Sequence, residues 1–240
     1  MTTPQAQIAA HLQNTKSLAV SPAWLNSFVS SSTALQRNIP LSALTQTVLF
    51  RILASDFRHS LATGNPSSLL PIDIFDPTVQ ERRLQGPIPV QVLDIEDIGA
   101  SLWSQVEAIE RVERGEAIRG REIVRTVNVG EDNEEGAAGA NANDTGNASN
   151  GSHRLILQDA AGTRAVGIEL VRVNGVALNK LSIGAKLVLL NATVARGMIL
   201  LTPECTTVLG GKIEGMDQAW KEGRKARLVA SIAGTEGGQT

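Results

Sequence analysis

The residue types that most often carry catalysis are few in this sequence, and their spacing matches no catalytic pattern. The three histidines, His11, His59 and His153, are not separated as metal ligands are. The "GGK" at 210–212 lacks the upstream glycine of a phosphate-binding loop, and no serine stands in a nucleophile elbow. We therefore predict no catalytic site, no metal and no cofactor, and the chain is expected not to be an enzyme.

The single cysteine, Cys205, excludes an internal disulfide and a multi-cysteine zinc site, and it favours a reduced compartment. A reactive thiol is one interpretation of Cys205, and a small buried core residue is the one that we favour. The acids Glu81, Asp94, Glu96 and Asp97 are scattered, and we predict that water solvates them.

A second kind of chemistry, binding to a partner, is suggested by residues 111–127. This segment carries five arginines and three glutamates, with β-branched side chains between them. Arginine beside β-branched residues suits a segment that orders on a partner by strand addition or groove docking. The alternative is a loop that folds back on its own domain. The predicted contact residues are Arg119, Arg121, Ile123, Val124, Arg125 and Val127.

Composition limits the classes of partner. The 240 residues are 42% hydrophobic and 19% charged, and the formal net charge is −2. Such a chain can bury a sizeable core but has no overall basic field for nucleic acid or an anionic membrane. The first ten residues do not form a signal peptide, and no apolar run has transmembrane length, so we expect no contact with a membrane.

The first sixty residues are predicted to be helical. Thr3-Pro4 and Ser21-Pro22 each pair a capping residue with proline at the first helical position, and Pro40 precedes a third helical pattern. We predict a small three-helix bundle over residues 1–63, which ends in the proline-rich segment after Thr63. The bundle either supports the next domain or binds a partner.

The rest of the chain, residues 64–240, alternates like strands. One strand is expected in "PIPVQVLDIEDIG", one hairpin in "RLILQDAAGTRAVGIEL", and a second hairpin joins "KLVLLNATV" to "MILLT", before a C-terminal helix. Five strands in this order predict an α+β chain whose second domain is a five-stranded OB-fold β-barrel. A long insertion, residues 100–153, separates the first two strands; it begins with a helix capped by Ser101, and about 130–152 should be disordered.

An OB-fold usually binds single-stranded nucleic acid by stacking bases on aromatic rings of the barrel. Between Trp103 and Trp220 this sequence contains no Phe, Tyr or Trp, and its basic residues are spread out. The barrel is therefore predicted to be a scaffold.

The motifs of the second domain resemble those of a known family. They are "LQGPIPVQVLDIEDIGAS" with "WSQVEAI", then "LILQDAAGTRAVGIEL", then "SIGAKLVLLNATVARGMILLTPECTTVLGG", which contains a G-x-K turn and ends in V-L-G-G. In their order they resemble the N-terminal region of the RecQ-mediated genome instability protein 1 family, over most of the chain.

This resemblance implies a non-catalytic OB-fold subunit that binds topoisomerase III, a type IA enzyme, and a RecQ-type helicase. The family's complex dissolves double Holliday junctions and decatenates DNA, which places it in homologous recombination, DNA repair, DNA replication and genome stability in the nucleus. DNA would be met mainly through the complex, with weak direct binding at most.

The resemblance also implies partner contacts. The family's loop between the first two barrel strands reaches into the topoisomerase gate; it corresponds to Gly99–His153, with Gly120–Val127 as the contact segment. The lysine of the G-x-K turn matches Lys186, which is either a partner contact or a solvated turn lysine. Further implied contacts are Arg196, Pro203 and Glu204.

Two questions stay open from the sequence. The sequence ends at Thr240 without a second OB-fold, as in the short fungal type, so binding of an additional small OB-fold subunit is in doubt. The alternative function is an autonomous OB-fold protein that binds single-stranded or junction DNA.

Overall fold

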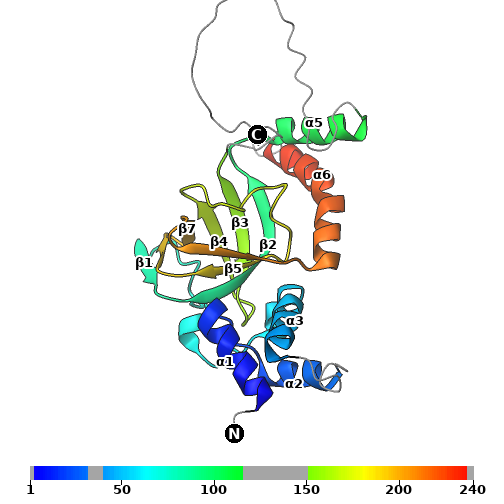
Figure 1. Ribbon diagram of the computed structural model, residues 1–240. Coiled ribbons are helices and arrows are strands. Elements are labelled where there is room, and N and C mark those ends of the chain that lie inside the picture. Colours follow the sequence, from blue (N-terminus) through cyan, green and yellow to red (C-terminus); the bar gives the residue numbers. More distant parts are fainter. Residues whose placement is uncertain (1–2, 32–39, 116–150, 237–240) are drawn as a thin grey trace, which may run out of the picture. The chain divides into compact units, whose positions relative to one another are not determined.

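The computed structural model describes residues 3–31, 40–115 and 151–236 (Figure 1). The chain divides into two compact units. One comprises Met1–Gly99 with Gly151–Gly223, and the other comprises Ala100–Asn150 with Arg224–Thr240. None of the helices described is long and apolar enough to cross a membrane.

The N-terminal helices begin where the sequence predicts. α1 (Pro4–Lys16) starts after Thr3, whose hydroxyl accepts a hydrogen bond from the backbone N–H of Ala6 at 3.3 Å. α2 (Pro22–Ser31) and α3 (Leu41–Leu53) follow, and both starts are confirmed. The described residues add a short fourth helix, α4 (Phe57–Ser60), and a 3-10 helix, η2 (Pro66–Ser68). The predicted three-helix bundle is therefore incomplete, because a four-residue helix is too short to show periodicity in the sequence.

The described strands form a single mixed sheet with the order β1-β6-β7-β4-β3-β2-β5-β8. Neighbouring strands are antiparallel except β4 and β7, which are parallel. The strands are β1 (Glu81–Leu84), β2 (Ile88–Asp97), β3 (His153–Gln158), β4 (Arg164–Glu169), β5 (Lys186–Leu189), β6 (Ala192–Ala195), β7 (Met198–Leu201) and β8 (Thr206–Gly210).

The prediction of five strands is wrong, since the sheet has eight among the described residues. The predicted strand "KLVLLNATV" is two strands, because Asn191 adopts φ 52° and the chain turns there from β5 into β6. β1 and β8 were missed because strands of four and five residues carry too few alternations to stand out from loops. The β3–β4 hairpin and the Arg196-Gly197 turn between β6 and β7 are confirmed.

β2 is the longest strand and pairs with two neighbours at its two ends. Its first part, Ile88–Gln91, pairs with β5, and Gln91–Asp97 pairs with β3, with a bulge between Val92 and Asp94. Pro89 therefore lies where β2 has a partner on one side only, as expected for a residue without a backbone N–H.

The sheet surrounds a core of aliphatic side chains, which includes Val90, Leu157, Leu187 and Ile199. Cys205 belongs to this core, as predicted. A second cluster lies between the N-terminal helices and takes in Ala160 of the β3–β4 turn and the partly buried Leu209 of β8. The helices and the sheet of this unit are thus packed together by apolar contacts.

The other unit is described through α5 (Leu102–Glu113) and the C-terminal part of α6 (Glu214–Glu236). Ser101 caps α5 as predicted, since its hydroxyl accepts from the backbone N–H of Ser104 at 3.1 Å. Lys225 of α6 forms ion pairs with Glu110 at 3.2 Å and with Glu113 at 2.7 Å, which hold the two helices together.

Candidate functional site

Lys186, an expected partner contact, is fully buried at the start of β5. Its Nζ donates a hydrogen bond to Gln91 Oε1 at 3.0 Å and lies 4.6 Å from the centroid of the Phe57 ring. The alternative in which Lys186 is a solvated turn lysine is therefore wrong. Its side chain projects from β5 under α4, and in this structure no surface of it is available to a partner.

Gln91 links this lysine to the helices and to the next strand. Its Oε1 also accepts from the backbone N–H of Phe57 at 3.0 Å. Its Nε2 donates to Asp56 Oδ1 at 2.9 Å and to Gln158 Oε1 at 3.1 Å. One buried glutamine side chain thus joins α4, β2, β3 and β5, so that helices and sheet share a polar connection as well as an apolar one.

Lys186 and Asp56, two charged side chains that are hydrogen-bonded to Gln91, have shifted pKa values. Burial lowers the pKa of Lys186 to about 7, and the negative charge of Asp56 acts in the opposite direction. For Asp56, burial acts to raise the pKa, but hydrogen bonds from the side chain and backbone of Arg58 and from Gln91 outweigh it and lower the pKa to about 2. Asp56 therefore stays ionised at neutral pH, next to a lysine that is held close to its own titration point.

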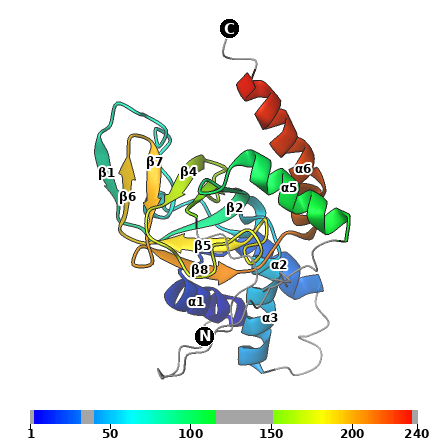
Figure 2. The same ribbon diagram turned by 90° about the horizontal axis from the view of Figure 1, so that it is seen from above.

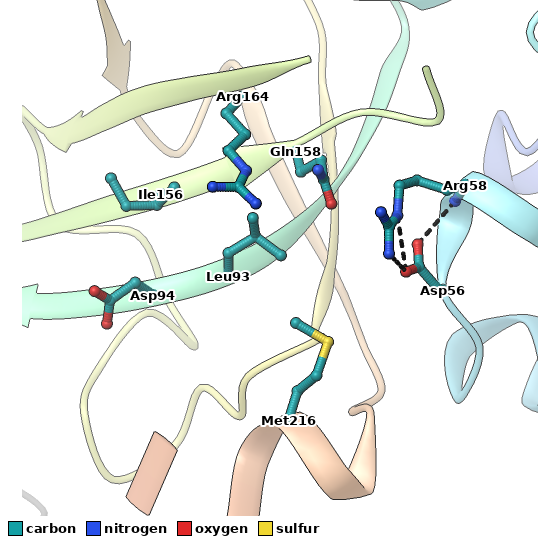
Figure 3. A pocket seen from close by; sticks show the side chains of 8 residues that line it. All are labelled: Asp56, Arg58, Leu93, Asp94, Ile156, Gln158, Arg164 and Met216. Carbon is teal, nitrogen blue, oxygen red and sulfur yellow. Dashed lines mark hydrogen bonds and ion pairs between the residues drawn. The ribbon is translucent and has the colours of Figure 1, made fainter. Parts of the chain in front are cut away.

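An open pocket of about 400 Å³ adjoins the cluster (Figure 3). At one side of the pocket, Arg58 donates two hydrogen bonds to Asp56, with Nη2–Oδ2 and Nε–Oδ2 distances of 2.7 and 3.0 Å. The carboxylate of Asp94 accepts a hydrogen bond from the indole N–H of Trp220. Both acids that line the pocket thus already accept hydrogen bonds. This arrangement suits packing or binding better than proton transfer. The lining residues are Asp56, Arg58, Leu93, Asp94, Ile156, Gln158, Arg164 and Met216.

A buried histidine–carboxylate pair lies at the start of β3. His153 Nδ1 is 2.7 Å from Glu169 Oε2, and both side chains are almost completely buried. Glu169 also accepts from the backbone N–H groups of His153 at 3.2 Å and Val173 at 2.7 Å. Among the residues described, no cluster of ligands could hold a metal ion. The hydrogen bonds to Glu169 hold the chain where β3 begins.

The insertion leaves and re-enters the sheet at one point. The backbone N–H of Ile98 donates to the carbonyl oxygen of Ser152 at 3.0 Å. A Cβ on Gly99 would come within 2.4 Å of the Cα of Gly151, so the two glycines are in backbone contact. Asp97 is buried here rather than solvated, and its Oδ1 accepts from the N–H of Gly99 at 2.8 Å. The ends of the insertion are thus held independently of what lies between them.

Backbone hydrogen bonds bring exposed apolar residues next to the segment that holds two of the expected partner contacts, Pro203 and Glu204, which are themselves exposed. Leu170 follows β4 and is 61% exposed; its N–H donates to the carbonyl oxygen of Leu201 at 2.9 Å. Leu190 follows β5 and is 47% exposed; its N–H donates to the carbonyl oxygen of Cys205 at 2.9 Å. We call this region the Pro203 surface; it comprises Leu170, Val171, Leu190, Pro203 and Glu204.

Arg196, another expected contact, lies elsewhere. It is exposed in the β6–β7 turn with φ 46°, and its backbone N–H donates to the carbonyl oxygen of Val79 at 3.2 Å. β7 separates Arg196 from the Pro203 surface, so the structure does not bring these contacts together. The remaining predicted contacts lie outside the described residues: Arg119, Arg121, Ile123, Val124, Arg125 and Val127.

Comparison with known families covers both the helices and the sheet. Residues 70–224 match the family described as "RMI1, N-terminal OB-fold domain", and residues 12–60 match "RMI1, N-terminal helical domain". The chain belongs to the RMI1 family. It is also 28% identical over 220 residues to the RecQ-mediated genome instability protein 1 of Schizosaccharomyces pombe (strain 972 / ATCC 24843), with 88% of each chain covered.

In this RMI1-family chain, two residues that join helices to sheet, Gln91 and Lys186, carry no signal of that role in the sequence. Gln91 and Lys186 stand at outward positions of their strands, between residues that point into the core. Outward polar residues normally meet water, so no signal in the sequence distinguishes these two. α4 lies over them, since Phe57 contacts the Lys186 ammonium group and donates its backbone N–H to Gln91.

Proposed function

We propose that this chain is a non-catalytic OB-fold subunit that acts in genome stability by binding topoisomerase III and a RecQ-type helicase. In this role it stimulates double Holliday junction dissolution and decatenation in the nucleus. The observation that carries the proposal is the match of both halves, residues 12–60 and 70–224, to the two N-terminal domains of the RMI1 family. The name of the Schizosaccharomyces pombe relative connects that protein to RecQ and to genome stability.

The Pro203 surface supports a docking role for the sheet domain. It offers three exposed aliphatic side chains with one carboxylate, and it is built from segments that the sheet holds rigidly. Rigid apolar groups lose little conformational entropy on binding and can serve as anchors of an interface. We assign this surface to the topoisomerase III interface, together with Lys186 in an indirect role, because Lys186 keeps the helices on the sheet.

The insertion, residues 100–153, is proposed to modulate the topoisomerase gate through Gly120–Val127. The arginines and β-branched residues of that segment support a docking role. The contact of Gly99 with Gly151 supports an insertion that can be altered without disturbing the sheet.

The test replaces Gly120–Val127 by a glycine–serine linker of equal length. A control variant replaces Ala137–Asp144, in the same insertion, by the same linker. We expect the Gly120–Val127 variant to fold normally and to co-purify with topoisomerase III but to stimulate decatenation poorly, while the control stimulates normally. Normal stimulation by the Gly120–Val127 variant would overturn the gate assignment, and failure of the unaltered chain to co-purify would overturn the proposed function.

The alternative function is autonomous DNA binding. Titration of the isolated chain with labelled single-stranded and junction DNA, over a range of salt concentrations, distinguishes it from the proposed function. The proposed function expects weak binding to both DNAs. Submicromolar affinity that falls steeply with salt would favour the alternative instead.

A further inference from the structure

β1 forms one end of the sheet, and both views place it at the outer border (Figures 1 and 2). It pairs with β6 on one side, and no described strand pairs with its other side. In an antiparallel strand every second residue turns its backbone N–H and C=O to the same side. β1 therefore presents hydrogen-bonding groups to any extended chain that lies alongside it.

Two exposed apolar side chains lie in the turn that precedes β1. Arg82 donates two hydrogen bonds to the carboxylate of Asp73, with Nη1–Oδ1 and Nη2–Oδ2 distances of 2.8 and 2.9 Å. These bonds hold the preceding turn against β1. Ile74 of that turn is buried in the core, while its neighbours Ile72 and Phe75 are 92% and 52% exposed. The turn thus meets Arg82 through Asp73, and its exposed apolar residues are Ile72 and Phe75.

The opposite face of β1 is charged. Side chains alternate between faces along a strand, so Glu81 and Arg83 share the face away from Arg82. Both are exposed, and neither forms an ion pair with a described residue. The acids of the preceding turn are already engaged: Asp73 by Arg82, and Asp76 by hydrogen bonds from the N–H and hydroxyl of Thr78 at 2.9 and 2.6 Å.

We propose that the β1 edge binds an extended segment of a partner protein by strand addition. The segment is amphipathic: its apolar side chains lie over Ile72 and Phe75, and on its other face a carboxylate meets Arg83 and an ammonium group meets Glu81. Charged residues on a short edge strand can also serve to block pairing. Blocking of strand pairing does not explain why Ile72 and Phe75 are exposed, because an edge protected against association would have its apolar side chains covered.

This proposal goes beyond the assigned partners, because it rests on β1 alone and holds whether or not topoisomerase III and the helicase bind elsewhere. The probe is a fluorescein-labelled peptide with valine at every second position. The positions between the valines are glutamate and lysine alternately. The matched control peptide has the same side chains and N-methyl groups on alternate amides, so that it cannot donate the hydrogen bonds of a strand. Binding of both is followed by fluorescence anisotropy with the full chain.

We expect the probe to bind and the N-methylated peptide not to bind. Phe75→Ser should weaken binding, and Arg83→Glu should weaken it by about fivefold, the upper range for one cross-strand pair. A peptide with lysine in place of glutamate should bind Arg83→Glu better than it binds the unaltered chain, which is a rescue that a structural defect cannot produce. The amides of β1 should exchange with solvent more slowly when the probe is bound.

Equal binding of the two peptides would overturn the proposal, and so would binding that Phe75→Ser and Arg83→Glu leave unchanged. A second copy of the chain is the competing occupant, because Glu81 of one copy could face Arg83 of another. Sedimentation over a range of concentrations distinguishes a second copy from a partner peptide. A dimer that Arg83→Glu dissociates would show that the β1 edge binds a second copy and would overturn the proposal.

Discussion

The ammonium group of Lys186 lies 4.6 Å from the centroid of the Phe57 ring, where a strand of the sheet meets the short helix α4. The lysine is completely buried and shares the oxygen of Gln91 with the backbone N–H of Phe57. This contact makes the junction of helices and sheet sensitive to charge, and the first two predictions concern it.

The first prediction is that stability rises with pH between about 7 and 10 because of Lys186. Its pKa is about 7 in the folded chain against 10.5 as a free side chain. Between these values the unfolded chain holds a proton that the folded chain has lost, so the free energy of unfolding increases with pH, by at most about 1.4 kcal/mol per pH unit. Urea unfolding at several pH values measures the slope.

Lys186→Met keeps an unbranched side chain one atom shorter, without the ammonium group, and should remove this contribution, so its slope is expected to be flatter than that of the unaltered chain. Arg164→Met, which removes an exposed cation, is the control and should keep the slope. Parallel stability curves for Lys186→Met and the unaltered chain would contradict the assignment.

The second prediction is that Gln91→Ala destabilises the chain by about 1–3 kcal/mol, because it leaves the buried groups of Phe57, Lys186 and Gln158 without their shared partner. Thermal or urea unfolding measures the loss. Gln80→Ala, at an exposed position, should change stability by less than about 0.5 kcal/mol. If both substitutions have the same small effect, Gln91 does not hold the junction.

The third prediction concerns the start of β3. Glu169→Ala removes an acceptor that receives two backbone N–H groups and faces His153, and should lower the free energy of unfolding by about 2–4 kcal/mol. Glu204→Ala, an exposed carboxylate, is the matched control and should be close to neutral. Hydrogen exchange should show faster opening of β3 in Glu169→Ala; protection equal to that of the unaltered chain would argue against this role.

The fourth prediction tests the Pro203 surface. Leu190→Asp places a charge among exposed apolar groups, so the fold should keep its melting temperature while affinity for topoisomerase III falls by about tenfold or more. Gln7→Asp, exposed on α1, adds the same charge away from this surface and should bind normally. Surface plasmon resonance with immobilised topoisomerase III gives both affinities. Unchanged binding by Leu190→Asp would exclude this surface from the interface.

Much of the local structure could be predicted from the sequence because local rules control it. Thr3 and Ser101 cap helices through hydrogen bonds to residues three positions ahead, and Arg196-Gly197 makes the tight turn that its residue types favour. Hydrophobic alternation located β2, β3 and β4. Where the pattern was shorter than about five residues, as in β1 and α4, no local rule could find the element.

The sequence by itself determined the helix starts, the principal hairpins, the place of the insertion and the resemblance to the RMI1 family, because caps, turns and alternation act over a few residues. Only the tertiary structure decided what covers the outer face of the sheet. Lys186 and Gln91 occupy positions that alternation assigns to solvent, and packing of α4 on β2 and β5 buries them. Burial of such an outward side chain depends on a segment far away in the sequence. The residues next to it in the sequence therefore do not indicate that it is buried.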